Sequence, residues 1–421
     1  MKLRLFLILW LLTVVRLGAQ INVQYETLLA QAGLAQLQKN YPLAISQFEQ
    51  AFLLHKPDAL NLYKLAAAYS SSNDLDSSVK TIDKALDSGW TEADLLAIDP
   101  DFDNLRNNLP DKWREILAKS KNIEQQYEHT IGLPALRKQI NSMTYADQRL
   151  RVARIRANDT LEIQKLTEEI NASDLKNLIE ARKIIQKYGW PKKSEIGKDG
   201  QNNLWLIVQH ADQDIELQKL ALRCMERYLK SSEIDLENYA FLYDRVQCNL
   251  NYKQLYGTQV IWTSNGRASG FRPILKESMV NKRRRKLGLL PLEIYALGYG
   301  FQYKEISNSL ASKNDRQTSI QTKSMITMAK SSLEKGEFEK VYDYYNSAST
   351  IMGGMTDAQN YEAAVSFAHI YNRNSEEKYR SISMDFLTLL KYRDRLDIKK
   401  LLAQQEFASF TKEPRWIQIL N

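Results

Sequence analysis

The chain has 421 residues, of which 44% are hydrophobic, so it is long enough for two or three domains that bury real cores. This composition is not that of an intrinsically disordered protein, and two cysteines are too few for a disulfide-dense scaffold. Much of the formal charge of +8 comes from residues 251–310, where ten Lys or Arg residues accompany three Asp or Glu residues. Such an excess is usually a solvated helix face, and we do not expect a nucleic acid as partner.

Residues 1–19 have the order of segments that a secretory signal peptide has. Lys2 and Arg4 precede an apolar run from Leu5 to Val15, and Leu17-Gly18-Ala19 follows. Cleavage after Ala19 would place the protein in the periplasm or outside the cell. The alternative is an uncleaved anchor, although this run is shorter than the roughly 20 residues of a spanning helix. No later segment is apolar for long enough, so we expect no stable membrane span after cleavage.

A repeat of 34 residues follows this segment. Small or apolar residues recur at this spacing, namely Ala32, Phe48 and Ala51, and then Ala66, Ile82 and Ala85. The spacing resembles the tetratricopeptide repeat, in which small residues let paired helices approach closely. We expect an array over residues 22–120, with helices near 24–39, 42–53, 58–70 and 74–87.

A closing tail follows this array and returns at the end of the chain. The first tail runs from Leu95-Leu96-Ala97 to Trp113, and the second runs from Leu401-Leu402-Ala403 to Trp416 with nearly the same spacing. Because two repeats bury little by themselves, each tail is expected to close a helical array. We therefore expect a second tetratricopeptide-like array over residues 320–421, preceded by a linker over residues 307–319.

Residues 134–306 are expected to form a central helical domain. From Gly257 to Ile274 the sequence is rich in Thr, Val, Ile, Trp and Phe around Asn265-Gly266, which is a hairpin signal. The predicted fold class is mainly α, with helical-repeat arrays at both ends of a central α-helical domain that carries one small β-hairpin. Cys224 and Cys248 could form one bridge after export, or could remain small core residues.

Five short motifs set the central region apart from the flanking helices. They are GWP at 189–191, QHAD at 209–212, DR at 244–245, QLYGTQ at 254–259 and VNKRRRKLGLLPLEIY at 280–295. Together they resemble an uncharacterised bacterial domain family that often stands next to tetratricopeptide-like helices in exported proteins. The resemblance covers about residues 139–300. The resemblance implies the fold of this region and the presence of helical repeats beside it, but no reaction.

His210 has carboxylates close by in sequence, so it is the candidate acid–base residue, together with Asp212 or Asp244. The structural alternatives are that Asp212 caps a helix and that Asp244 and Arg245 form an internal ion pair. One His with two Asp is a poor signature for a transition metal, so we expect no metal and no cofactor.

The turn near Gly257 supplies the candidate ligand-binding residues. They are Arg245, Gln254, Tyr256, Thr258 and Gln259, which a turn that enters a hairpin would point in one direction. We expect these residues to converge with His210 and Asp244 on one concave site. Asp147, Gln148 and Arg151 could complete this cluster from an earlier helix or could face solvent.

Two functions from different classes fit this pattern. The favoured one is an exported protein that binds or scaffolds a peptide or protein partner through its helical repeats, with a polar ligand site in the central domain. The alternative is a hydrolase-type enzyme that uses His210 with Asp212 or Asp244. The sequence has no Gly-x-Ser-x-Gly elbow, phosphate loop, HExxH or CxxC motif that would support a named chemistry.

Overall fold

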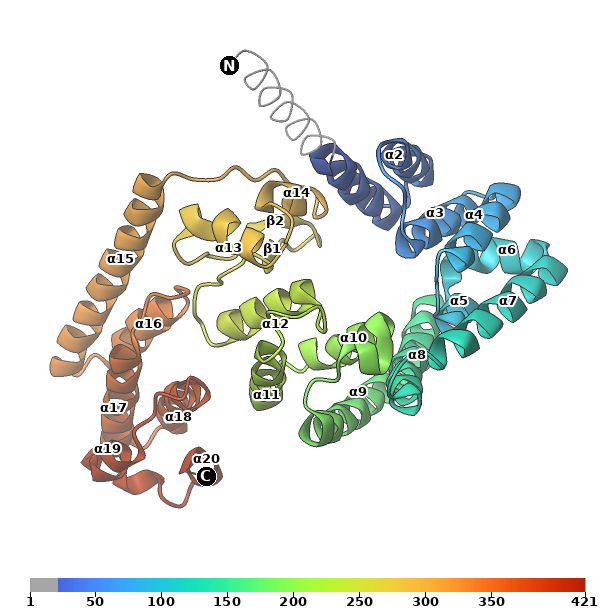
Figure 1. Ribbon diagram of the computed structural model, residues 1–421. Coiled ribbons are helices and arrows are strands. Elements are labelled where there is room, and N and C mark those ends of the chain that lie inside the picture. The colour runs from blue at the N-terminus through green and yellow to red at the C-terminus, as the bar shows by residue number, and fades with distance from the viewer. Residues whose placement is uncertain (1–21, 421) are drawn as a thin grey trace, which may run out of the picture.

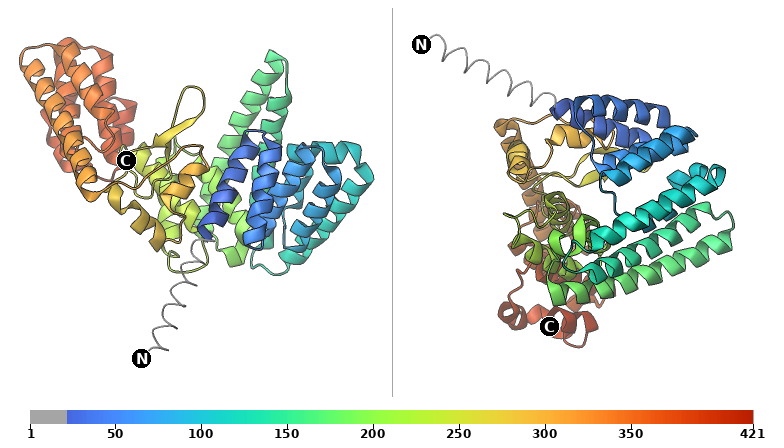
Figure 2. Two further views of the ribbon diagram at one scale, coloured as in Figure 1. Left: turned by 90° about the horizontal axis from the view of Figure 1, so that it is seen from above. Right: turned by 45° about the vertical axis from the view of Figure 1, so that its right-hand side comes forward.

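A computed structural model describes residues 22–420, and the expected signal peptide lies outside these residues. Over this range the protein is mainly helical and carries one two-stranded sheet, which confirms the mainly α class with a small hairpin. Figure 1 shows the helices along an arc that runs from the N-terminal helices through the central domain to the C-terminal helices. In Figure 2 the central domain lies between the two flanking groups.

The N-terminal helices follow the predicted pattern. They are a helix over residues 22–37, α2 (Tyr41–Leu54), α3 (Ala59–Ser71) and α4 (Leu75–Asp87). Asp58 and Asp74 cap α3 and α4 by accepting hydrogen bonds from the backbone N–H groups of Asn61 and Ser77. The residues that recur every 34 positions, from Ala32 to Ala85, are all buried. The assignment to the tetratricopeptide class stays a prediction.

The two closing tails are built alike, each with a short α-helix, a 3-10 turn and a final helix that carries the tryptophan, and the first tail has α6 in addition. The first tail consists of α5 (Ala93–Ile98), η1 (Pro100–Phe102), α6 (Asp103–Asn108) and α7 (Pro110–Glu128). The second consists of α19 (Ile398–Ala403), η3 (Gln405–Phe410) and α20 (Pro414–Leu420). Trp113 packs on Phe102 at 5.7 Å between ring centroids, and Trp416 packs on Phe410 at 6.0 Å. Both tryptophans are at most 4% exposed, which confirms their predicted burial.

The C-terminal helices begin earlier than the sequence suggests. They are α15 (Asn308–Glu334), α16 (Phe338–Ser349), α17 (Asp357–Asn374) and α18 (Glu377–Tyr392). The segment 307–319, expected as a linker, therefore lies in α15, and the irregular connection is residues 301–307. The reason is that the Ser307 hydroxyl caps this helix, while Ala311 is buried beneath its first turns.

The central domain is built from five longer helices and a short irregular region. The helices are α8 (Pro134–Arg156), α9 (Thr160–Tyr188), α10 (Lys193–Gln209), α11 (Ile215–Glu226) and α12 (Leu236–Asn249). Trp190 lies in the core at 2% exposure, directly after Gly189 ends α9 with a φ of 70°. Trp190 therefore anchors the loop after α9 in the core.

The predicted hairpin is confirmed. β1 (Val260–Trp262) pairs antiparallel with β2 (Ala268–Phe271), and Gly266 in the connecting turn has a φ of 74°. The domain ends with η2 (Glu277–Met279), α13 (Val280–Lys286) and α14 (Leu292–Leu297).

The C-terminal helices are fastened to the central domain by a buried arginine. Arg393 donates from Nε and Nη2 to the Leu250 carbonyl at 2.9 and 2.7 Å, and Nη1 contacts Asp357 at 2.8 Å. Its guanidinium also lies over the Tyr252 ring at 4.1 Å from the centroid. One side chain therefore ties the end of α12 to the start of α17.

Neither a disulfide nor a spanning helix is found in the described part of the chain. Cys224 and Cys248 are free and buried, and burial raises the pKa of the Cys248 thiol to about 12. They therefore act as small core residues. No helix between residues 22 and 420 is both long enough and apolar enough to cross a membrane.

Candidate functional site

Asp244 anchors the turn that contains the QLYGTQ motif. Its carboxylate is fully buried and accepts hydrogen bonds from the backbone N–H groups of Leu255, Tyr256 and Thr258 at 2.7–3.1 Å. The Thr258 hydroxyl donates a further bond at 3.0 Å. Burial raises the pKa of Asp244, while these donors act in the opposite direction. Asp244 is thus occupied as a structural acceptor.

Two arginines of the basic run hold the other side of the same turn. Arg283 donates to the Leu255 carbonyl at 2.6 Å, and Arg284 donates to the Tyr256 carbonyl at 2.7 Å. Arg284 is only 2% exposed and lies over the Tyr295 ring. The expectation of a solvated basic face is therefore wrong for these two residues, because the turn carbonyls offer them buried acceptors.

Gln254 and Gln259 bond to each other across the turn. The Gln254 amide oxygen accepts from the Gln259 N–H at 2.8 Å, and its nitrogen donates to the Gln259 carbonyl at 2.9 Å. Gln254, Thr258 and Gln259 are at most 9% exposed. The polar groups of this turn are largely used within the protein, and their contact with a ligand stays a prediction.

Arg245 pairs with Asp212 rather than with its neighbour Asp244. Its Nε and Nη2 atoms reach the two Asp212 carboxylate oxygens at 2.7 and 2.5 Å, and the Asn249 amide adds a bond at 2.8 Å. Partial burial opposes ionisation of Asp212, but these donors outweigh it and lower the pKa of this carboxyl. The bidentate pair joins the QHAD and DR motifs across the start of α11.

His210 ends α10 and opens onto a cleft of about 550 Å³. We call this the His210 cleft. It lies between α8, α9 and the connection from α10 to α11, and its charged or imidazole side chains are Asp147, Arg151, Asp174, His210 and Asp212. The Asp147, Gln148 and Arg151 set, for which the sequence left two interpretations open, lines this cleft together with His210.

Partial desolvation in the cleft lowers the pKa of His210, and the positive charges of Arg245 and Arg151 lower it further. The imidazole is therefore neutral near pH 7. Its Nε2 atom lies 2.8 Å from the Gln209 side-chain nitrogen. Among the hydrogen bonds of residues 22–420, none joins His210 to a carboxylate. Because an amide nitrogen only donates, Nε2 is the acceptor of the hydrogen bond from Gln209, and the proton of the neutral ring is on Nδ1.

The predicted site residues thus fall into two groups instead of one concave site. His210 and Asp212 line the cleft, with Arg245 bonded to Asp212. Asp244, Gln254, Thr258 and Gln259 belong to the buried turn. Asp244 is separated from the cleft because the backbone N–H groups of the turn need a buried acceptor, and the Asp244 carboxylate provides it. The catalytic roles of His210, Asp212 and Asp244 stay predictions.

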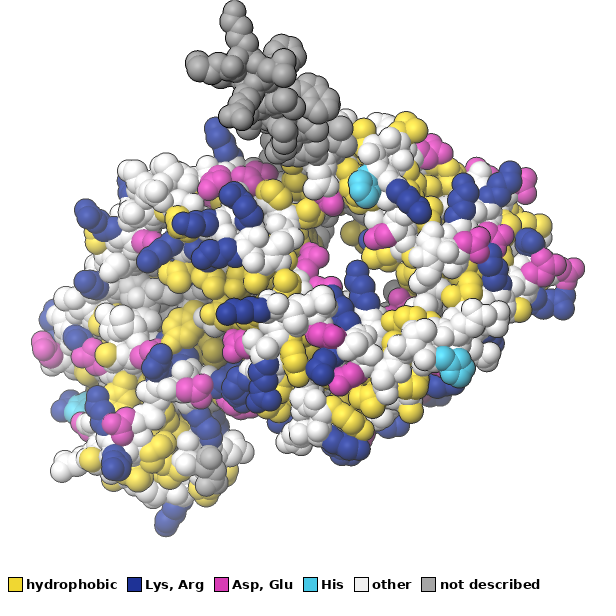
Figure 3. Space-filling view, in the orientation of Figure 1, with side chains coloured by type: hydrophobic (Ala, Val, Ile, Leu, Met, Phe, Trp, Pro, Cys, Tyr) yellow, Lys and Arg dark blue, Asp and Glu magenta, His cyan; other side chains and the backbone are white. Residues whose placement is uncertain are grey.

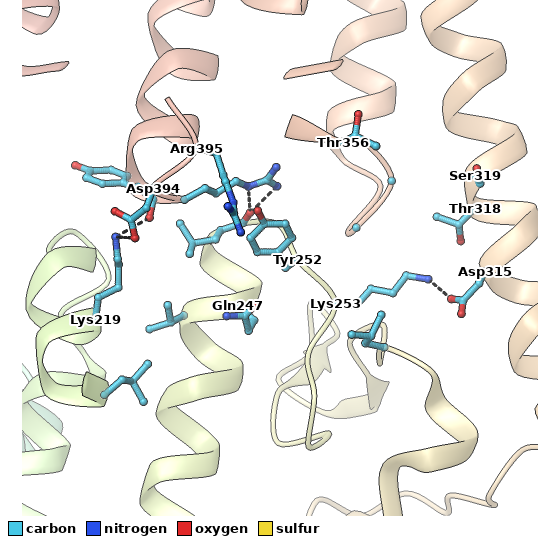
Figure 4. Close-up of a pocket in the computed structure, with 18 of the residues that line it drawn as sticks. Lys219, Gln247, Tyr252, Lys253, Asp315, Thr318, Ser319, Thr356, Asp394 and Arg395 are labelled. Carbon is cyan, nitrogen blue, oxygen red and sulfur yellow. Dashed lines mark hydrogen bonds and ion pairs between the residues drawn. The ribbon is translucent and has the colours of Figure 1, made fainter. Parts of the chain in front are cut away.

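A second concave region was not predicted from the sequence. We call it the interdomain groove, a space of about 780 Å³ between α11 and α12 on one wall and α15, the start of α17 and residues 392–395 on the other. Figure 4 shows Lys219 beside Asp394 at one end and Lys253 beside Asp315 at the other, with Arg395 between them. The two ion pairs measure 2.7 and 2.6 Å.

No sequence signal could have found this groove, because its walls are 62 to 175 residues apart where ion pairs join them. The face drawn in Figure 3 is mixed in charge. Figure 3 shows Lys and Arg interspersed with Asp and Glu over the visible face. On this face, therefore, the basic residues do not form the continuous stripe that is typical of nucleic-acid binding.

Comparison with known proteins identifies one part of the chain. Residues 134–303 match the model of a family described as a family of unknown function (DUF6624). Comparison with curated proteins and comparison with solved structures each gave no match. The matched range includes the helices of the His210 cleft and the anchored turn. The central region is thus similar to an uncharacterised domain family, as the motifs suggest.

Proposed function

We propose that this chain is an exported bacterial protein that binds a polypeptide partner in the interdomain groove, while the His210 cleft is a separate polar ligand site. The groove of about 780 Å³, which both apolar and charged side chains line, is the observation that carries this proposal.

The floor of the groove supplies apolar contact. Leu222, Val246 and Leu250 line it from α11 and the end of α12. Polar groups that can form hydrogen bonds with a peptide lie around them, including the hydroxyls of Thr318, Ser319 and Thr356. Polypeptide segments present both kinds of surface, so the groove offers a match for an extended segment.

Two arginines remain available at the groove. Arg395 lies 3.8 Å from Asp357, and 67% of its side chain is exposed. Arg223 is also exposed on the α11 wall. Arginine is enriched at protein interfaces because its planar guanidinium both stacks and donates several hydrogen bonds.

The hydrolase alternative has less support from geometry. Asp244 is bonded to the turn, and Asp212 is bonded to Arg245 and Asn249. Neither carboxylate orients His210 through a hydrogen bond in the described part of the chain. A catalytic base normally needs such an orienting partner, so binding is the better supported function.

Site-specific photo-cross-linking tests the proposal. A photoreactive residue at Ser319, which is exposed on α15 at the groove, should capture a defined polypeptide in the native cells. The same residue at Lys121, which is exposed on α7, is the control position. Equal products at both positions would mean non-specific capture.

Binding of the purified partner gives the second measurement. Arg395→Glu and Arg223→Glu should each weaken binding about tenfold or more, because they reverse a charge inside the interface. Arg285→Glu makes the same change at an exposed position outside the groove and should have little effect. Unchanged affinity in both groove variants would rule out this surface.

A further inference from the structure

We propose that the His210 cleft binds a primary alkylammonium group, either the end of a lysine side chain or a free aliphatic amine. This inference rests on the proposed polar ligand site and is independent of the interdomain groove.

The charges that line the cleft favour a cation. Three carboxylates line it, those of Asp147, Asp174 and Asp212, against the single guanidinium of Arg151. Arg245 neutralises Asp212 through the bidentate pair. Since His210 is neutral near pH 7, one negative charge remains after both arginines are counted. A cationic ligand would balance it.

Arg151 is poorly placed to bind an anion. Its Nε atom contacts Asp147 at 2.7 Å, and its Nη2 atom contacts Asp174 at 2.8 Å. Because two carboxylates already share this guanidinium, an anionic ligand would have to displace one of them. The same arrangement leaves part of the carboxylate hydrogen-bonding capacity unused.

Asp147 shows where that capacity lies. The residue is only 8% exposed, and its Oδ2 atom accepts hydrogen bonds from Arg151 and Gln148. Its Oδ1 atom is buried and has no hydrogen-bond partner among the described residues. A buried charged oxygen without a donor is costly, so a donor that enters from the cleft would be bound with a gain in free energy.

The remaining wall of the cleft fits an alkyl chain. Leu178, Leu206 and Ile207 line it, and Leu175 stands at the edge with 61% of its surface exposed. An aliphatic amine would cover these side chains with methylene groups while its ammonium group donates to Asp174 or Asp147. The ammonium group thus matches the carboxylates of the cleft, and the alkyl chain matches its apolar wall.

Calorimetric titration of the full chain with pentylamine near neutral pH tests the proposal. Pentylamine should bind with saturation. Pentanol, which carries a hydroxyl on the same alkyl chain, and pentanoate, which has the same number of carbon atoms but ends in a carboxylate, should not. Preferred binding of pentanoate would mean an anion site, and equal binding of pentanol would mean an apolar pocket. Either result, or the absence of saturable binding of pentylamine, overturns the proposal.

Variants locate the site. Asp174→Asn should weaken pentylamine binding about tenfold or more, because a charge-assisted hydrogen bond is lost. Asp147→Asn should have a similar effect, and the half-exposed Asp174 serves as the test if the buried variant unfolds. Asp385→Asn removes the same charge on α18, away from the cleft, and should leave binding unchanged. Equal affinity in Asp174→Asn and Asp385→Asn would contradict the assignment.

Two further comparisons separate the possible sources and the two proposals. Tighter binding of Nα-acetyl-lysine amide than of pentylamine would assign the ammonium group to a polypeptide, and the reverse order would assign it to a free amine. Arg395→Glu should not change amine binding, since it lies in the interdomain groove. Failure of the groove proposal therefore leaves the cleft proposal intact, and the converse also holds.

Discussion

Arg137 Nη2 lies 2.6 Å from Asp199 Oδ2, in the contact between the first closing tail and the central domain. The same guanidinium reaches Glu124 at 3.1 Å and Glu128 at 3.3 Å on α7. It is fully buried and pairs with carboxylates from two groups of helices. This relationship makes the contact depend on a single side chain.

We predict that Arg137→Met lowers the free energy of unfolding by about 3–5 kcal/mol, because it leaves the buried Asp199 carboxylate without its charged partner. Chemical denaturation measures this change. Arg114→Met is a suitable control, since Arg114 pairs with Asp111 on the exposed face of α7 and such pairs contribute about 0–1 kcal/mol. Similar losses in both variants would contradict the prediction.

Glu92 should make the stability of this contact depend on pH. Burial, and then the nearby charge of Asp199, raise the pKa of Glu92 to about 7, above its ordinary value of 4.5. The unfolded chain therefore loses this proton at lower pH than the folded chain. The contribution of Glu92 to the free energy of unfolding is therefore largest below pH 4.5. It falls as the pH rises toward about 7 and does not change further above that.

We expect Glu92→Gln to remove that fall, because the amide cannot ionise. The free energy of unfolding of the variant, relative to the wild type, should rise by on the order of 3 kcal/mol between pH 4.5 and pH 8. Denaturation curves across this range provide the measurement. Parallel pH profiles for the two proteins would show that Glu92 does not titrate in this window.

Trp113→Ala and Trp416→Ala should each cost about 3–5 kcal/mol, because each side chain fills the centre of a closing tail. Thermal unfolding reports the loss. Trp262→Ala is the matched control, since Trp262 on β1 is 60% exposed and leaves no comparable cavity. An unchanged melting temperature in both tail variants would mean that the tails do not close the helical groups.

Asp244→Asn distinguishes an anchoring role from a catalytic one. It should cost about 3 kcal/mol of folding free energy, since an amide cannot replace all the bonds that the carboxylate accepts from the turn. The pKa of His210, measured by NMR titration, should stay below its ordinary value in this variant. A large change in that pKa would instead place Asp244 in direct contact with His210.

The sequence predicted local structure well where one helix or turn carries its own signal. Apolar spacing marks the N-terminal helices, and Asn265-Gly266 marks the hairpin turn. The start of α15 was an exception, because the polar segment 307–319 resembles a linker in sequence. In the structure the Ser307 hydroxyl caps this helix and Ala311 is buried.

The candidate site was harder to predict, because hydrogen-bond partners far apart in sequence decide the role of each polar residue. From the sequence alone Asp244 is a candidate to bind a ligand or a proton, but in the structure the backbone N–H groups of Leu255, Tyr256 and Thr258 occupy its carboxylate. Arg283 and Arg284 likewise find their acceptors 28 residues earlier. His210 lines a cleft, but its neighbours there come from α8, α9 and the connection to α11 rather than from the turn.

Arg393 bears on how fast the proposed polypeptide partner would associate with the interdomain groove. Its guanidinium bonds to the Leu250 carbonyl at the end of α12 and to Asp357 at the start of α17. These two contacts fix the separation between the two walls of the groove. A partner then meets a preorganised shape and spends no binding free energy on bringing the walls together. Its observed association rate should rise linearly with concentration, without the plateau that a slow closing step would impose.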